Sequence, residues 1–205
     1  MNLKLLIAKG LKKILNPPAL RNCNIDKTSR VCSQSELTRV KMGRYSYIGN
    51  DCFMVNTSIG SFCSIADRCY IGGAKHPIER VSSSPVFHKG ANVLGKNFQD
   101  FASVQTPLTI IENDVWIGIG AIVKAGVVIH NGAVIGMGSV VTHDVPAYEV
   151  WAGNPARKLY DRFSPDVKQK LINSQWWCWN EDDLKIKSRY FESPDNLIKT
   201  FEIKD

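Results

Sequence analysis

Residues 111–146 read IENDVWIGIGAIVKAGVVIHNGAVIGMGSVVTHDVP, and this stretch decides the fold because it repeats every six residues. Every hexad opens with Ile or Val. The fifth positions are all small or β-branched: Val115, Ala121, Val127, Ala133, Ser139 and Val145. An amphipathic helix would repeat its apolar residues about every 3.6 positions, and a half-buried strand would repeat them every two. A period of six with β-branched openers instead predicts a parallel β-helix.

In such a coil each hexad supplies one short strand and one corner, and three hexads complete a turn. We expect the first and fifth positions of each hexad to point inward. Coils stack about 4.8 Å apart, so residues 18 positions apart should lie on one another: Ile111 on Ile129, Ile117 on Ile135, and Val123 on Val141. Several glycines follow the first position, where a side chain would crowd the corner, at 49, 60, 72, 118 and 136.

The same pattern occurs earlier in the chain. Clear hexads open at Ile59, Ile65 and Ile71, and weaker ones open at Ile25, Val31 and Leu37. The interval from position 48 to 59 is one residue short of two hexads, which predicts a tightened corner. Three cysteines fall at fifth positions and are expected to be buried, reduced thiols, with Cys52 above Cys69 and no disulfide: Cys52, Cys63 and Cys69. No cysteine pair has zinc-site spacing, so no metal site is predicted.

The repeat stops at Ile71-Gly72 and resumes near Ile111. About 40 residues are too many for a simple connection, so residues 73–108 are predicted to form a functional loop. We therefore divide the chain into an N-terminal amphipathic helix and linker (1–20), a β-helix domain carrying the loop (21–160) and a C-terminal helical extension (161–205). A helix in that extension is expected to start near Ser164-Pro165, with the serine as its N-cap.

The formal net charge is +7, but basic residues are scattered and show no interleaving with aromatic residues, so no nucleic-acid partner is expected. The N-terminus lacks the features of a secretory signal, and no apolar run approaches the ~20 residues of a membrane span. We expect a cytoplasmic protein. Residues 2–15 have apolar positions at helical spacing. That predicted helix either contacts the inner face of the cytoplasmic membrane or caps the open end of the β-helix.

The stretch NDVWIGIGAIVKAGVVIHNGAVIGMGSVVTHDVPAYEVWAGNPAR resembles the hexapeptide-repeat acyltransferases. The motifs VWIG, IGMGSVVTHDVP and GNPAR stand in that family's order. The tail RFSPDVKQKLINSQWWCWNEDDLKI resembles the branch that contains xenobiotic acetyltransferases and polysaccharide O-acetyltransferases. The resemblance implies an all-β fold, namely a left-handed parallel β-helix with a protruding active-site loop and a C-terminal α-helix. It also implies a homotrimer, acetyl-CoA as the donor, no metal, and an active site between two subunits.

Acetyl transfer from a thioester to a hydroxyl needs a base, and a neutral imidazole has a suitable pKa near pH 7. The motif KHP places His76 where the sugar acetyltransferases of this family carry their catalytic histidine. His88 lies on the same loop and is a candidate contact to substrate. Backbone N–H groups of a coil corner can stabilise the oxyanion. A loop histidine without such a role is the alternative interpretation.

The resemblance also implies donor-binding positions. Matched to the family's motifs, these are Gly118, Ile119, Met137, Thr142 and Arg157. His143 stands where relatives usually carry a lysine near the CoA phosphates. Lys158, beside Arg157, can bind a phosphate or form part of a solvated pair. Trp116 either packs on the pantetheine arm or covers a corner.

Our first hypothesis is an acetyl-CoA-dependent O-acetyltransferase that acts on a sugar hydroxyl in surface polysaccharide biosynthesis. The loop sequence HPIERVSSSPVFH resembles loops of those enzymes more than those of antibiotic-modifying relatives, which carry YPF after the histidine. The alternatives are a xenobiotic acetyltransferase acting on chloramphenicol or streptogramin A, an amino-sugar N-acetyltransferase, and a non-catalytic β-helix scaffold.

Overall fold

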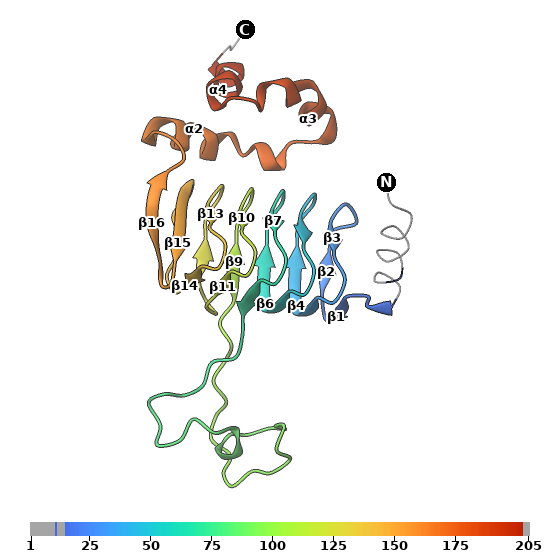
Figure 1. Cartoon of the computed structure of the whole chain (residues 1–205), viewed down its shortest axis with the longest axis vertical. Helices are drawn as coiled ribbons and strands as arrows, with labels where there is room; N and C mark the ends of the chain where they lie inside the picture. The colour runs from blue at the N-terminus through green and yellow to red at the C-terminus, as the bar shows by residue number, and fades with distance from the viewer. Residues whose placement is uncertain (1–10, 12–14, 203–205) are drawn as a thin grey trace.

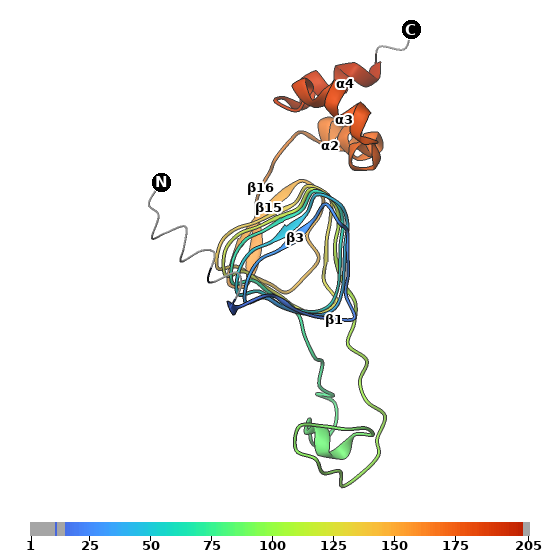
Figure 2. The ribbon, with the colours of Figure 1, turned by 90° about the vertical axis from the view of Figure 1, so that its right-hand side faces the viewer.

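The structure is a computed structural model that describes residue 11 and residues 15–202. The chain winds into a parallel β-solenoid of about eight turns followed by a short helical region, which confirms the predicted fold class. Figure 1 shows the strands stacked along the solenoid axis. Figure 2 looks along that axis at a triangular cross-section. In both views the loop projects from one side of the solenoid and the C-terminal helices lie on the opposite side.

The solenoid has three faces, which we number in chain order. Face 1 contains β1 (Ala19–Arg21), β8 (Tyr70–Gly72), β11 (Ile122–Val123) and β14 (Val140–Val141). Face 2 contains β2 (Asn24–Ile25), β9 (Thr109–Ile111) and β12 (Val128–Ile129). Two longer strands bend around the corner and belong to both faces: β4 (Glu36–Met42) and β6 (Phe53–Ile59).

Face 3 is a separate seven-stranded sheet. Its strands are β3 (Arg30–Val31), β5 (Tyr47–Ile48), β7 (Ser64–Ile65), β10 (Trp116–Ile117), β13 (Val134–Ile135), β15 (Glu149–Gly153) and β16 (Ala156–Asp161). All these strands pair in parallel except β16, which returns antiparallel to β15. The hairpin of β15 and β16 therefore ends the stack of face 3.

The interior is built as the hexads predict. The expected stacks are present as register pairs, namely Ile111 with Ile129, Ile117 with Ile135, and Val123 with Val141. These side chains are at most 1% exposed, and the fifth-position side chains are at most 4% exposed. Fully burying one such aliphatic side chain contributes about 1.5–3 kcal/mol. The repeated pattern therefore supplies one continuous core along the axis.

The inward cysteines behave as small apolar residues. Cys52, Cys63 and Cys69 are buried and free. The backbone N–H of Cys69 donates to the Sγ of Cys52 at 3.4 Å, which confirms that Cys52 lies over Cys69 without a disulfide. Burial raises the pKa of the Cys63 thiol to about 12. Because the thiolate is the reactive form, Cys63 is chemically inert at neutral pH.

The predicted tightened corner lies between faces 1 and 2. Leu37 pairs with Met54, and Met54 with Ile71, at intervals of 17 rather than 18 positions. β4 and β6 turn this corner through single residues in the left-handed conformation, with φ of 55° at Arg39 and 50° at Asn56. Asparagine adopts this conformation more readily than most residues. After the loop the intervals are 18 positions.

Residues 73–108 leave the solenoid at this same corner, between β8 and β9. They contain one short 3-10 helix, η1 (Pro85–Phe87). The side-chain amide of Asn56 donates to the Thr106 carbonyl at 2.9 Å and holds the returning end of the loop. A Cβ at Gly72 would lie 2.1 Å from the Val55 carbonyl oxygen. Only glycine allows the chain to leave so close to the coil beneath.

Up to residue 202, the C-terminal region has three α-helices, where the sequence predicted one. They are α2 (Pro165–Ser174), α3 (Glu181–Lys187) and α4 (Pro194–Glu202), with 3-10 turns η2 (Trp176–Cys178) and η3 (Ser188–Tyr190) between them. The Ser164 side chain caps α2, as predicted. Gln175 then adopts a φ of 43° and ends α2, and the Asn180 side chain caps α3. The short, separately capped segments explain why one continuous helix does not form.

The helical region packs on the corner between faces 2 and 3. Its buried cluster combines a corner residue, Tyr148, with side chains of the helices, Leu171, Trp176, Trp177 and Leu197. Within residue 11 and residues 15–202, no helix is both long enough and apolar enough to cross a membrane. The amphipathic helix predicted for residues 2–15 lies outside the described residues except at positions 11 and 15.

Candidate active site

His76 lies four residues beyond β8, at the start of the loop, and its side chain is exposed. Its Nδ1 lies 2.9 Å from the carbonyl oxygen of Ser83. Because a carbonyl oxygen only accepts, Nδ1–H is the donor, and Nε2 then carries the free lone pair. The neighbouring Pro77 is buried. With Nδ1–H engaged in this hydrogen bond, Nε2 is the ring nitrogen that is left to accept a proton.

The sequence does not mark Ser83 as the partner of His76. The contact uses a main-chain oxygen, which every residue carries, so no residue type marks it. It depends on the loop turning back within seven residues. The serine run 82–84 supports this turn, since the Ser82 hydroxyl accepts from the backbone N–H of Ser84.

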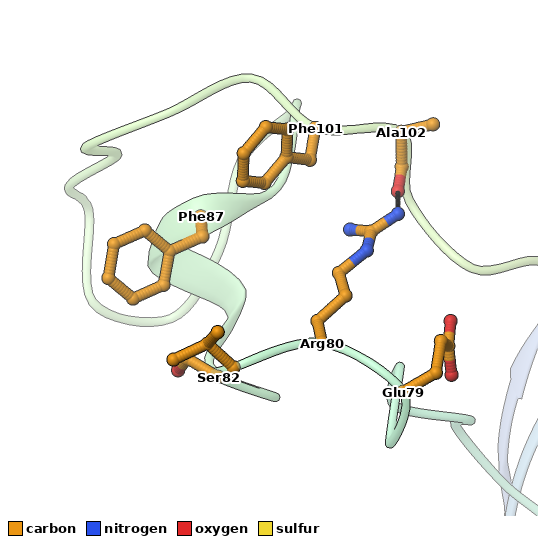
Figure 3. Close-up of a pocket in the computed structure, with 7 residues that line it drawn as sticks. Glu79, Arg80, Ser82, Phe87, Phe101 and Ala102 are labelled. Atoms are coloured by element: carbon orange, nitrogen blue, oxygen red, sulfur yellow. Dashed lines mark hydrogen bonds between the residues drawn. The ribbon is translucent and has the colours of Figure 1, made fainter.

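A hollow of about 580 Å³ lies within the loop and is lined by residues 79–82, Phe87, Phe101 and Ala102. Figure 3 shows Arg80 crossing it from the outgoing to the returning arm of the loop. The Arg80 guanidinium donates to the Ala102 carbonyl at 3.0 Å and lies 5.5 Å from the centre of the Phe101 ring. Arg80 therefore ties together the two arms that hold His76.

His88 is placed inside the loop rather than facing solvent. Its backbone N–H donates to the Pro85 carbonyl, and its backbone forms an isolated β-bridge with that of Phe101. Its Nε2 is shielded from solvent and has no hydrogen-bond partner among the residues that the structure describes. A contact between His88 and substrate stays a prediction, and it would require this nitrogen to become accessible.

Three of the predicted donor-binding residues meet at the corner between faces 3 and 1. Corners 118–121 and 136–139 stack there, and the backbone N–H of Gly138 donates to the Ile119 carbonyl at 2.9 Å. A Cβ at Gly118 would lie 2.6 Å from the Met137 nitrogen, so glycine is required for this close stacking. The side chains of Ile119 and Met137 are exposed. Trp116 is also exposed, on face 3 beside the corner.

Thr142 and His143 are not at that corner. They follow β14 at the opposite edge of face 1, on the same corner from which the loop leaves. The Thr142 hydroxyl lies 2.9 Å from the Nδ1 of His143. Gly118, Ile119 and Met137 thus lie at one edge of face 1, and Thr142 and His143 lie at the other.

Arg157 and Lys158 lie on β16 but differ in their partners. The Lys158 ammonium lies 2.7 Å from Asp161 and 2.8 Å from Glu149. Its hydrogen bonds to Asp161 and then to Glu149 raise the pKa of Lys158. Arg157 donates to the Ala156 carbonyl and has no carboxylate partner within the described part of the chain. Of the two, Arg157 is the side chain free to bind a phosphate.

The family model for bacterial transferase hexapeptide repeats (six repeats) matches residues 108–143. A chloramphenicol acetyltransferase of Klebsiella aerogenes is 34% identical over 179 residues, which are 78% of this chain and 85% of that protein. The chain belongs to the hexapeptide-repeat acetyltransferases. It is therefore an enzyme of the acetyltransferase class, as the sequence predicted.

A second relative is similar in sequence, and two solved structures are similar in fold. A probable macrolide acetyltransferase of Lysinibacillus sphaericus is 31% identical over 147 residues, 68% of this chain and 76% of that protein. The solved structure of the polySia specific acetyltransferase NeuO has a TM-score of 0.50 and 26% identity, covering 76% of this chain and 69% of that one. AntD, an N-acyltransferase from Bacillus cereus, shares the fold, with a TM-score of 0.52, 22% identity and coverage of 82% and 95%.

In this hexapeptide-repeat acetyltransferase, His76 and the exposed corner between faces 3 and 1 belong to different parts of the fold. His76 is carried by the loop, and Gly118, Ile119 and Met137 by the corner on the far edge of face 1. Among the described residues, no group of three His, Cys, Asp or Glu side chains is positioned to hold a metal ion. The chemistry that this arrangement offers is proton transfer by an imidazole beside a long, open solenoid face.

Proposed function

We propose that the protein is an acetyl-CoA-dependent O-acetyltransferase that transfers an acetyl group to a saccharide hydroxyl in surface polysaccharide biosynthesis in the cytoplasm. The observation that carries the proposal is the hydrogen bond from His76 Nδ1 to the Ser83 carbonyl, which leaves Nε2 as a base. This is the group that hydroxyl attack on a thioester requires at neutral pH.

In the proposed reaction, His76 Nε2 takes the proton of the acceptor hydroxyl as its oxygen attacks the thioester carbonyl carbon. The carbonyl becomes an oxyanion, which backbone N–H groups of a corner stabilise. The carbon–sulfur bond then breaks, and the leaving CoA thiolate takes the proton from the imidazolium. Atoms and charges balance, the base is regenerated, and neither a metal nor a covalent intermediate is needed.

The donor is proposed to lie along the edges of face 1, with its reactive end toward the loop of a neighbouring copy in a homotrimer. Gly118, Ile119 and Met137 would contact it largely through the backbone, and Trp116 would pack on its pantetheine arm. Thr142 and His143 would line the other edge. Arg157 would bind a phosphate, with Lys158 contributing through its ion pairs rather than directly. His88 would line the acceptor side.

A second candidate is a xenobiotic acetyltransferase. The similarity to a chloramphenicol acetyltransferase, over 85% of that protein, favours it. Transfer to an amino sugar would use the same base on an amine.

The candidates are separated by measuring thiol release from acetyl-CoA with chloramphenicol, streptogramin A, neutral saccharides, amino sugars and sugar nucleotides as acceptors. We expect turnover with a saccharide and identification of an O-acetyl product by mass spectrometry. Turnover restricted to the antibiotics would replace the first proposal by the second. Absence of both turnover and CoA binding would favour a scaffold.

A further inference from the structure

A second concave region lies next to His76 and is used by none of the residues assigned above. A groove of about 640 Å³ runs over the N-terminal coils of face 1 to the base of the loop. Gly73 and Ala74, at the start of the loop, and Thr106, at its end, form one end of the groove. Ala74 is two residues from His76, so their Cα atoms are at most about 7 Å apart. The groove therefore opens beside the proposed base.

The groove carries positive charge. Arg21 and Arg39 line it, and both side chains are exposed. Neither guanidinium has a hydrogen bond or ion pair to any residue that the structure describes. Glu36 is the only carboxylate among the lining residues, so the lining has a net charge of +1. An unpaired arginine is suited to bidentate binding of phosphate oxygens.

The groove also has an aromatic surface. Phe53 lines it, and the Phe53 and Tyr70 rings lie next to each other, with centres 6.4 Å apart and exposed outer faces. Arg21 pairs with Thr38, Thr38 with Val55, and Val55 with Gly72, where the loop begins. Arg21 therefore lies three inter-strand spacings, or about 14 Å, from Gly72. This length accommodates a sugar ring near the loop followed by a diphosphate near the arginines.

We infer that this groove binds the phosphate groups of the acceptor, so that the substrate class is a saccharide linked to a diphosphate. The sugar would lie toward His76, and the diphosphate would bind Arg21 and Arg39. The inference rests on the proposed O-acetyltransferase function and makes it more specific. A neutral antibiotic such as chloramphenicol has no anion for these arginines. A nucleotide sugar and a lipid-linked sugar share the required chemistry.

Binding of inorganic pyrophosphate tests the groove without reference to catalysis. Calorimetry is done with CoA at saturation, so that the donor's own phosphate site is filled. We expect wild-type protein to bind pyrophosphate and the double variant Arg21→Gln/Arg39→Gln to bind it about tenfold more weakly or worse. Arg30→Gln, which changes an exposed arginine on face 3, should bind like wild type. Glu36→Gln should bind more tightly. Equal binding by all variants, or no binding by wild type, would overturn the inference.

Kinetics then separate this inference from the function on which it rests. The acceptors are UDP-N-acetylglucosamine, the same sugar on a short-chain prenyl diphosphate, and the free sugar. We expect the double arginine variant to have a higher KM for the diphosphate acceptors and an unchanged KM for acetyl-CoA. Whichever diphosphate acceptor is used better shows whether the natural acceptor is a nucleotide sugar or a lipid-linked sugar. Transfer to the diphosphate acceptors with a KM that the arginine changes leave unaffected would overturn the inference but not the function. Arginine-dependent pyrophosphate binding without any acetyl transfer would overturn the function but leave the anion site.

Discussion

At the scale of single residues, the proposed chemistry depends on one nitrogen of His76. Replacing it by glutamine keeps a polar side chain but removes the base, so we expect kcat to fall about 10²–10⁴-fold. Because the His76 side chain is exposed, the unfolding temperature should not change. Steady-state kinetics and thermal unfolding check this. Turnover within about twofold of wild type would remove His76 from the mechanism.

Arg157 and Lys158 are neighbours in sequence but should differ in function. Lys158 already holds two carboxylates, whereas Arg157 keeps donors free. We predict that Arg157→Gln weakens CoA binding about fivefold or more, and that Lys158→Gln changes it by less than about twofold. Calorimetry with CoA makes the comparison. The reverse order would show that the ion pairs of Lys158 open when the donor binds.

At the scale of elements, Asp114 couples the solenoid to the helical region. It lies in the corner before β10 and lines the cavities against Trp176 and Phe191. Burial raises the pKa of Asp114 to about 6, although Arg162, 3.7 Å away, opposes the rise. A raised carboxyl pKa means that the folded state binds the proton more readily than the unfolded state. The contribution of protonated Asp114 to the stability of the folded state is therefore greatest below about pH 4 and is lost as pH rises through about 6.

Asp114→Asn should consequently raise the unfolding temperature at pH 7.5 and flatten its pH dependence between about pH 4 and 7. The asparagine keeps an oxygen for Arg162 but carries no charge to bury. Asp166→Asn, an exposed residue at the start of α2, is the matched control and should behave like wild type. Thermal unfolding across this pH range tests the prediction. Parallel curves for wild type and Asp114→Asn would contradict it.

The elements also show what a sequence of this kind can predict. The hexad is a local pattern, so the inward stacks, the position of Cys52 over Cys69 and the exit of the loop follow from spacing alone. The number of C-terminal helices does not follow, because Gln175 takes a left-handed conformation that no simple pattern requires. The Ser83 carbonyl and the groove with Arg21 and Arg39 arise from chain segments that meet only after folding. These were accordingly not predicted.

At the scale of the whole molecule, the loop exposes several large apolar side chains. Ile78 is 88% exposed, Val93 is 97% exposed, and Val81 is fully exposed, on a segment that projects away from the solenoid (Figures 1 and 2). Large exposed apolar surfaces mark interaction sites. The proposed homotrimer would bury them and would bring His76 of one copy to the donor-binding edge of the next.

Light scattering should therefore give about three times the 22.9 kDa chain mass. Val81→Asp combined with Val93→Asp should lower that mass and the activity together, because the charges oppose burial of the loop. Ile186→Asp, an exposed apolar position on α3 at the opposite side of the solenoid, should affect neither. A monomer with full activity would refute the shared site.

A site shared between subunits also predicts complementation. His76→Gln lacks the base and Arg157→Glu repels the donor phosphates, so each homotrimer should be inactive or nearly so. In trimers assembled from both chains, some interfaces combine an intact loop with an intact donor edge, about a quarter of them for random mixing. Activity should therefore appear on co-expression and be absent when the two purified homotrimers are simply combined without exchange. If co-expression restores nothing, His76 and Arg157 act within one chain, and the donor must then reach His76 around the edge of its own face 1.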